Sequence, residues 1–249
     1  MKRKYEIAVV SKGAYARTLR IYAPKKADRA VIMHDGQNVF YDSDASYGKS
    51  WRALDALKAS GIKNTAIIGI DSTATRMDDY LPFETELADY VPISCGGKAD
   101  LYVDYIETRV IPYLTERFGF KMYAMLGSSA GALATLCFAE KNHNAFKAYG
   151  MYSTPLFVSA AAYEKHLKEV RFAGGAFYHV YTGGSESTTD KVDAKIESGL
   201  FVNDAFKLVN ALRDGGATNI KLDLDGLSVH DENSWRAPEK IFFDTFSKM

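Results

Sequence analysis

Residues 122–134 have the sequence MYAMLGSSAGALA, in which a short apolar run is followed by the motif G-x-S-x-G and by small residues typical of a helix. A serine at such a strand-to-helix turn is held in a strained backbone conformation, and the flanking Gly127 and Gly131 leave room for the neighbouring strand and helix. The helix start then directs backbone N–H groups at the serine. This context predicts Ser129 as a nucleophile and the Ala130 N–H as an oxyanion donor, although a Gly/Ser-rich turn without chemistry has the same motif.

Outward from this turn, short apolar runs alternate with helical patterns along most of the chain. Two alternating segments at 5–10 and 18–22 predict a pair of antiparallel strands at the edge of a sheet. The rest predicts a mainly parallel sheet with helices on both faces, because parallel neighbours need crossover connections. Ligands bind such sheets at the carboxyl ends of the strands, so we expect the site in the loops there. The further strands are expected at 30–33, 66–70, 122–126, 148–152, 177–181 and 220–224, and the helices at 51–60, 100–118, 130–141, 159–170, 200–214 and 232–249.

The composition indicates a single α/β domain over residues 1–249, since 47% of the 249 residues are hydrophobic and no linker-like tract interrupts the pattern. The 31 Lys and Arg balance the 31 Asp and Glu, so no long-range field favours nucleic acid or a membrane surface, and a small-molecule partner is expected. The apolar run after the basic start is too short for a signal peptide or a membrane span. The two cysteines, Cys95 and Cys137, cannot form a disulfide framework, and a cytoplasmic location fits this usage.

A serine hydroxyl needs a positioned base, normally a histidine, and the chain has five histidines. His230 alone follows the last expected strand, in a polar loop that leads into the final helix. The order along the chain in folds with this serine turn is serine, acid, histidine, so His230 is the predicted base. For His34, His143, His166 and His179, we expect a solvated or structurally satisfied side chain.

The acid is expected after the strand at 177–181, which lies between the serine and the histidine in the sequence. Glu186 is the first carboxylate after that strand, and its distance along the chain from both other residues leaves room for a strand and a helix on either side. Gly183 and Gly184 before it predict a tight turn that directs the carboxylate toward His230. The alternative acids are Asp190 and Asp193.

A second oxyanion donor is expected in the loop after the strand at 30–33. Residues 33–40 there have the sequence MHDGQNVF, in which Gly36 lets the backbone turn closely. The Gln37 N–H is the candidate donor beside that of Ala130, with an ordinary Asp-Gly turn as the alternative. Neither a metal nor another cofactor is expected, because the chain has no H-E-x-x-H motif, Cys/His cluster or complete calcium loop.

Aromatic side chains in the expected loops around the site are candidates for stacking on a sugar or phenolic ring. Phe40, Trp51 and Trp235 are the candidate substrate-binding residues, with core packing as the alternative because it is the commoner fate of aromatic side chains. The segment 153–163 is too short for a large lid, which predicts an open cleft that admits bulky alcohol groups.

Four stretches, at 33–40, 127–131, 183–186 and 230–235, together resemble the putative-esterase (esterase D-like) family of α/β-hydrolases over roughly residues 17–247. This family includes feruloyl, acetyl-xylan and siderophore esterases and S-formylglutathione hydrolases. Similar stretches in the family carry the oxyanion loop, the nucleophile, the acid and the base. The resemblance implies the α/β-hydrolase fold and hydrolysis of a carboxylic ester. The chain departs from the family after the serine, where Ala130-Gly131-Ala132 replaces the usual Met-Gly-Gly.

The expected function is therefore hydrolysis of small or carbohydrate- or phenolic-type esters through an acyl-enzyme on Ser129. An acyltransferase would use the same residues with an alcohol in place of water. The alternative from another class is a non-catalytic binding protein of the same fold. The presence of serine, histidine and acid together argues against it. A peptidase is chemically feasible, and the resemblance disfavours it.

Overall fold

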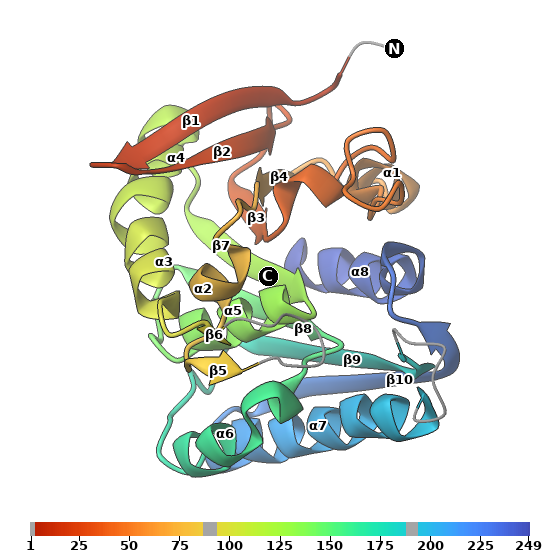
Figure 1. Ribbon diagram of the computed structural model, residues 1–249. Helices are drawn as coiled ribbons and strands as arrows, with labels where there is room; N and C mark the ends of the chain where they lie inside the picture. The colour runs from red at the N-terminus through yellow and green to blue at the C-terminus, as the bar shows by residue number, and fades with distance from the viewer. Residues whose placement is uncertain (1–2, 87–93, 188–193) are drawn as a thin grey trace.

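The computed structural model describes residues 3–86, 94–187 and 194–249. Within them, an eight-stranded sheet with the order β1-β2-β4-β3-β7-β8-β9-β10 forms the centre, and helices cover both of its faces (Figure 1). The strands of this sheet are β1 (Glu6–Lys12), β2 (Tyr15–Tyr22), β3 (Arg29–Met33), β4 (Thr65–Ile70), β7 (Met122–Ser128), β8 (Phe146–Tyr152), β9 (Phe177–Ser185) and β10 (Asn219–Val229). The helices are α1 (Ala53–Ala59), α2 (Arg76–Tyr80), α3 (Ala99–Tyr105), α4 (Ile111–Phe118), α5 (Ala130–Ala139), α6 (Ala160–His166), α7 (Ala194–Asp214) and α8 (Glu232–Phe246).

The sheet is parallel except at one end. β1 pairs antiparallel with β2, and β2 pairs antiparallel with β4, whereas every neighbouring pair from β4 through β10 is parallel. The predicted mainly parallel sheet with N-terminal antiparallel strands is therefore confirmed. Because the parallel strands share one direction, the loops after β3, β7, β9 and β10 all leave the sheet at the same edge.

Both faces of the sheet are buried, which explains the unbroken apolar runs of its strands. Along β7, Tyr123 and Met125 pack into a core shared with helices α3 to α7, whereas Ala124 and Leu126 pack into a second core with α1 and α8. A strand covered on both faces needs apolar side chains on both, so it lacks the polar alternation of a half-exposed strand. None of the described helices combines the length and apolar character that crossing a bilayer requires.

Some elements differ from the prediction or were not predicted. The single helix expected at 100–118 is α3, a π-helical turn at Ile106–Val110 and α4 in succession. Pro112 at the start of α4 lacks the N–H that would bond one turn back, which accounts for a change of hydrogen-bond pattern there. The short strands β5 (Thr85–Glu86) and β6 (Ser94–Cys95) and the five-residue α2 are too short for a periodic apolar pattern to mark them.

Candidate active site

Ser129 lies at the turn between β7 and α5 with φ +54° and ψ −131°. Side-chain-bearing residues rarely adopt such a conformation, which costs about 1–3 kcal/mol and persists only where the surroundings impose it. The Ser129 N–H donates to the carbonyl oxygen of Tyr152 at 2.9 Å, which ties the turn to β8. A Cβ on Gly127 would lie 2.2 Å from the carbonyl oxygen of Gly131, so only glycine fits there. The predicted strained strand-to-helix turn is confirmed.

His230 lies between β10 and α8, with its Nδ1 2.7 Å from Oε2 of Glu186. The next residue, Asp231, is the N-cap of α8 and accepts a hydrogen bond from the Ser234 N–H at 3.0 Å, which fixes where the loop ends. Ser129 and His230 line the same pocket. Within the described residues the Ser129 hydroxyl forms no hydrogen bond. The distance between a nucleophile and its base is often long in an unliganded site and shortens only when substrate binds.

Glu186 is fully buried, and its two oxygens have different partners. Oε2 faces His230, whereas Oε1 accepts hydrogen bonds from the Ser153 hydroxyl at 2.5 Å, the Gly183 N–H at 2.5 Å and the Thr182 hydroxyl at 3.3 Å. Burial alone would raise the pKa of Glu186, but the hydrogen bond and charge of His230, with the hydrogen bonds of Ser153 and Gly183, hold that pKa below its ordinary value. The carboxylate is thus ionised and can accept from the Nδ1–H of His230.

The tight turn predicted at Gly183 and Gly184 is wrong, because β9 continues through both residues. β10 lies so close to them that a Cβ on Gly183 would be 2.2 Å from the carbonyl oxygen of Ser228. The glycines therefore permit the approach of two backbones rather than a reversal of the chain. The alternative acids Asp190 and Asp193 lie outside the described residues.

Two successive hydrogen bonds support Oε1 of Glu186, the oxygen that does not contact His230. The indole N–H of Trp235 donates to the Ser153 Oγ at 2.9 Å, and Ser153 in turn donates to Glu186. The Trp235 ring also packs edge-on against the His230 ring, with centroids 5.1 Å apart. Sequence reasoning missed Ser153, which directly follows β8 at the carboxyl edge of the sheet and has a φ of +49°. Its position after a strand is the signal that could have found it.

The loop of residues 34–40, called here the β3 loop, carries Gln37 into the same pocket as Ser129. The Gln37 side chain is held by Ser72, since Nε2 donates to the Ser72 hydroxyl at 2.8 Å and Oε1 accepts from the Ser72 N–H at 3.1 Å. Neither the Gln37 N–H nor the Ala130 N–H donates a hydrogen bond within the described part of the chain. Both predicted oxyanion donors are therefore available, the first in the pocket lining and the second directly after the serine.

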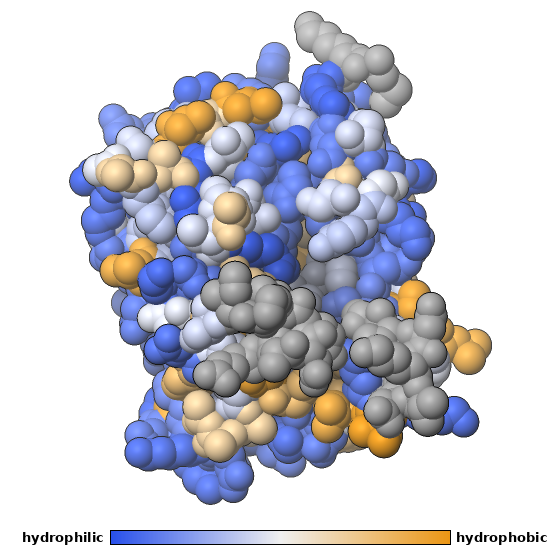
Figure 2. Space-filling view, viewed as in Figure 1, coloured by the Kyte–Doolittle hydropathy of each residue, from blue (hydrophilic) through white to orange (hydrophobic). Residues whose placement is uncertain are grey.

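The pocket around Ser129 has a volume of about 410 Å³ and is lined largely by polar side chains. Trp51 and Trp235 line it and stack with ring centroids 5.4 Å apart, but each is only 3–4% exposed and presents little surface. Figure 2 shows this side of the molecule hollowed near its centre, with mainly hydrophilic surroundings. The lining residues are Asp35, Gln37, Asn38, Ser46, Tyr47, Trp51, Ser72, Arg76, Ser128, Ser129, His230, Glu232 and Trp235.

Phe40 does not line this pocket. It is buried at 3% exposure, packs on Tyr5 with ring centroids 4.8 Å apart, and borders a separate hollow beside α1. Gln37 and Asn38 line the pocket, whereas Phe40, two residues further on, packs into the core. The core alternative therefore holds for Phe40.

Each of the other histidines has a structural partner, although Nε2 of the buried His34 has none among the described residues. His179 is fully buried, with Nδ1 3.0 Å from the Tyr152 hydroxyl and Nε2 2.8 Å from Asp223. His34 contacts the Tyr102 hydroxyl through Nδ1, and burial lowers the pKa of His34 to about 4. A histidine–carboxylate pair alone thus does not mark the base, because His179 has one and does not line the pocket of Ser129. His143 accepts from the Ala145 N–H, and His166 pairs with Glu140.

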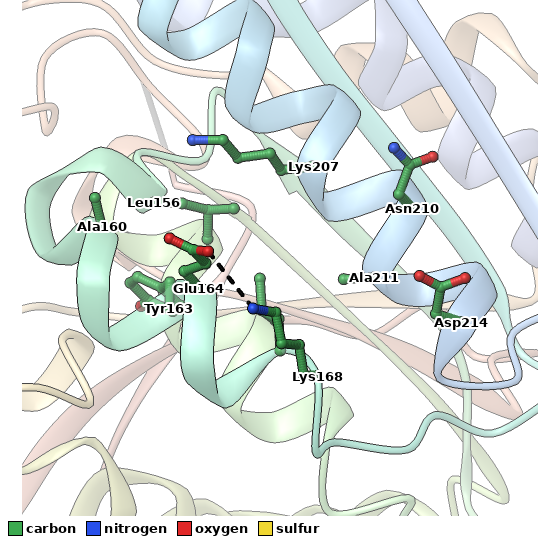
Figure 3. A pocket seen from close by; sticks show the side chains of 10 residues that line it. Leu156, Ala160, Tyr163, Glu164, Lys168, Lys207, Asn210, Ala211 and Asp214 are labelled. Carbon is green, nitrogen blue, oxygen red and sulfur yellow. Dashed lines mark hydrogen bonds and ion pairs between the residues drawn. The ribbon is translucent and has the colours of Figure 1, made fainter.

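A larger groove of about 520 Å³ lies between α6 and α7 (Figure 3). Leu156 and Ala211 give it apolar surface, and Lys168 pairs with Glu164 at 3.5 Å on its α6 side. None of the predicted site residues lines it. Convergent reactive groups, rather than volume, identify a candidate active site, and here they lie at Ser129.

The sheet order, the helices on both faces and the turn at Ser129 define an α/β-hydrolase fold. The chain belongs to the family described as "Putative esterase", whose match spans residues 15–199 and so ends before His230. No curated protein sequence matches the chain.

Solved structures share the fold at low sequence identity. An IroE-like serine hydrolase from Shewanella oneidensis aligns with a TM-score of 0.80 and 17% identity, over 98% of this chain and 80% of that one. The siderophore hydrolase EstA from Aspergillus nidulans aligns with a TM-score of 0.76 and 16% identity, over 98% and 95%. A ferulic acid esterase aligns with a TM-score of 0.66 and 13% identity, over 98% and 96%.

Proposed function

We propose that this chain is a serine carboxylic-ester hydrolase in which Ser129 is the nucleophile, His230 the base and Glu186 the acid. One observation carries the proposal: Ser129, in a strained strand-to-helix turn, shares a pocket with His230, and Nδ1 of His230 is hydrogen-bonded to the buried, ionised carboxylate of Glu186. Membership of an esterase family supports the reaction class.

The reaction would proceed in two steps. The Ser129 hydroxyl attacks the ester carbonyl while Nε2 of His230 takes its proton, and the proton then passes to the leaving alcohol. The resulting acyl-enzyme is cleaved by water, which His230 activates in the same way. Glu186 keeps the proton of His230 on Nδ1, so that Nε2 is free to accept, and it stabilises the imidazolium that forms.

The Gln37 and Ala130 N–H groups would stabilise the oxyanion of each tetrahedral intermediate. Their availability supports this role, as does the position of Ala130 at the start of α5, where the helix dipole favours negative charge. One such donor contributes about 3–4 kcal/mol to the transition state in comparable enzymes.

The pocket supports compact ester substrates, such as those of small acids, sugars or phenols. A volume of about 410 Å³ lies toward the lower end of the range for small-molecule sites, and the polar lining suits a substrate with hydroxyl groups. We therefore expect preference for short acyl chains. An ester panel from p-nitrophenyl acetate to longer acyl chains, acetylated sugars and methyl ferulate measures this, and a strong preference for long-chain lipids would contradict it.

Ser129→Ala tests the central assignment. We expect it to abolish ester hydrolysis while leaving the melting temperature close to that of the wild type, because it removes the attacking oxygen and little else. A fluorophosphonate should label Ser129, located by peptide mass spectrometry, and Ser128→Ala should still be labelled. Turnover retained by folded Ser129→Ala would refute the proposal, and ester products formed with added alcohols would redirect it to acyl transfer.

A further inference from the structure

The short helix α2 contacts the β3 loop through two of its side chains. Arg76 and Tyr80 lie four residues apart, on one side of the helix, and the Arg76 guanidinium lies over the Tyr80 ring at 5.0 Å. Both reach Asp35. Nε and Nη2 of Arg76 donate to the two carboxylate oxygens of Asp35 at 2.7 and 2.8 Å, and the Asp35 N–H donates to the Tyr80 hydroxyl at 3.1 Å.

Asp35 needs such support because its φ of +53° and ψ of +53° place it in the left-handed region. Glycine adopts this region freely, Asn and Asp adopt it occasionally, and other residues rarely do. Asp35 directly precedes the helical turn at Gly36–Asn38, so its backbone conformation sets the direction of the Gln37 N–H. A bidentate arginine pair is the most directional way to hold a carboxylate in place.

The Asp35–Arg76 contact is an ion pair at neutral pH. Burial alone would raise the pKa of Asp35, but the charge and hydrogen bonds of Arg76 hold it below its ordinary value. Neighbouring contacts also fix the position of the β3 loop. Ser72 holds the Gln37 side chain, and Gly36 lies so close to β4 that a Cβ on it would be 2.5 Å from the backbone of Gly69. The segment 69–80 thus holds the β3 loop at three successive residues.

We propose that α2 sets the direction of the Gln37 N–H toward the oxyanion, and that Arg76 is its principal positioning residue. This inference rests on the proposed function. It assigns Arg76, which lines the pocket, to holding the loop rather than to contacting the reacting atoms.

Arg76→Gln and Arg76→Lys test the inference with p-nitrophenyl acetate. For Arg76→Gln we expect kcat to fall by about 10- to 100-fold with KM nearly unchanged, since a misdirected oxyanion donor weakens the transition state and not the bound ester. A trifluoromethyl ketone, which forms a tetrahedral adduct with the serine, should bind more weakly by a similar factor. Lysine should recover only part of the loss, because it cannot form the bidentate pair. Tyr80→Phe should lower kcat less, and in the same direction.

Lys98→Gln is the matched control. Asp78 lies on α2 with Arg76, and Lys98 pairs with it at 2.6 Å. Lys98 does not contact the β3 loop, so the variant should keep wild-type kcat. If folded Arg76→Lys and Tyr80→Phe both keep wild-type kcat and ketone affinity, the inference is wrong while the proposed function stands. A wild-type chain that neither hydrolyses esters nor reacts with a fluorophosphonate would overturn the proposed function itself. A kcat loss in Lys98→Gln equal to that of Arg76→Gln would reduce Arg76 to a stabiliser of α2.

Discussion

Glu186 combines complete burial with an ionised side chain, because every neighbour that faces its oxygens donates a hydrogen bond. Glu186→Gln should lower kcat by about 10²- to 10⁴-fold with a modest change in KM, since an amide N–H facing Nδ1 favours the wrong tautomer of His230. Steady-state kinetics measure kcat and KM separately. The kcat of Asp190→Asn and Asp193→Asn should stay near the wild-type value. If one of these variants loses activity while Glu186→Gln keeps it, that aspartate is the acid.

Ser153 is predicted to matter to catalysis without touching the substrate. Ser153→Ala removes the hydroxyl that links Trp235 to Glu186, so the indole N–H of Trp235 loses its partner and Oε1 of Glu186 loses one of its three donors. We expect a loss of about 1–3 kcal/mol of unfolding free energy. The kcat should fall by about tenfold, because Glu186 is then held less firmly against His230. Urea unfolding and steady-state kinetics measure the two effects.

Ser153→Gly and Trp235→Phe separate the possible causes. Glycine relieves the backbone strain at φ +49° but also removes the hydroxyl, so its kcat should match that of the alanine variant. Trp235→Phe should lower kcat less, and should add little in the Ser153→Ala background if the two residues act through one hydrogen-bond chain. Wild-type kcat in both Ser153 variants would show that the hydrogen bonds from Trp235 through Ser153 to Glu186 have no catalytic role.

At the scale of one element, α8 begins where its N-cap places it, and His230 is the residue before that cap. Asp231→Ala should cost about 1 kcal/mol of stability, since it removes the side-chain acceptor of the Ser234 N–H, whereas Asp231→Asn keeps an acceptor and should cost less. Thermal and urea unfolding compare the two. We also expect kcat to fall more in the alanine variant, because the loop that ends at the cap positions the imidazole. Equal stability of both variants would show that the Lys49 ion pair, rather than the cap, is the important contact.

Elements with a strong apolar pattern were predictable, and those held by polar contacts were not. The strands that carry the site are buried on both faces, so their sequence alone marked them, as at 122–126 and 177–181. The five residues of α2 hold their place through ion pairs, with Asp79 to Arg17 and Arg76 to Asp35, and such partners are distant in sequence. Pairings of this kind become visible only once the sheet brings the segments together.

At the scale of the whole molecule, one buried acid on α8 affects how stability depends on pH. Glu239 on α8 is completely buried, and neither of its oxygens has a hydrogen-bond partner among the described residues. Burial raises the pKa of Glu239 well above its ordinary value. The folded chain therefore keeps a proton that the unfolded chain releases above about pH 4.5, so this residue lowers stability progressively as the pH rises toward the folded pKa.

Glu239→Gln should remove this pH dependence. The difference in unfolding free energy between variant and wild type should increase with pH by up to about 1.4 kcal/mol per pH unit, measured by urea unfolding at pH 6, 7 and 8. Glu164→Gln, an exposed change on α6, should retain the wild-type slope. Parallel slopes for Glu239→Gln and wild type would mean that Glu239 is ionised in the folded chain.

The candidate site could be predicted from the sequence as far as single strands place single residues. Ser129, Glu186 and His230 each directly follow a recognisable strand, or come within one residue of it, so their convergence follows from the parallel sheet. Phe40 and Ser153 were misjudged or missed because a turn of the chain decides their surroundings. Whether an aromatic ring faces a pocket or the core depends on one or two backbone angles, which composition does not encode.

The proposed nucleophile, acid and base directly follow β7, β9 and β10, which are neighbours in the sheet in chain order with β8, and the base follows the last of them. During synthesis, a growing chain acquires the β3 loop, the serine and then the carboxylate well before it has a proton acceptor. Under the proposed mechanism, such a chain could not activate its serine until β10 had brought His230 to Glu186. Under the proposed mechanism, a ribosome-bound chain that stops before His230 would be unable to hydrolyse esters, however much of the sheet it had already formed.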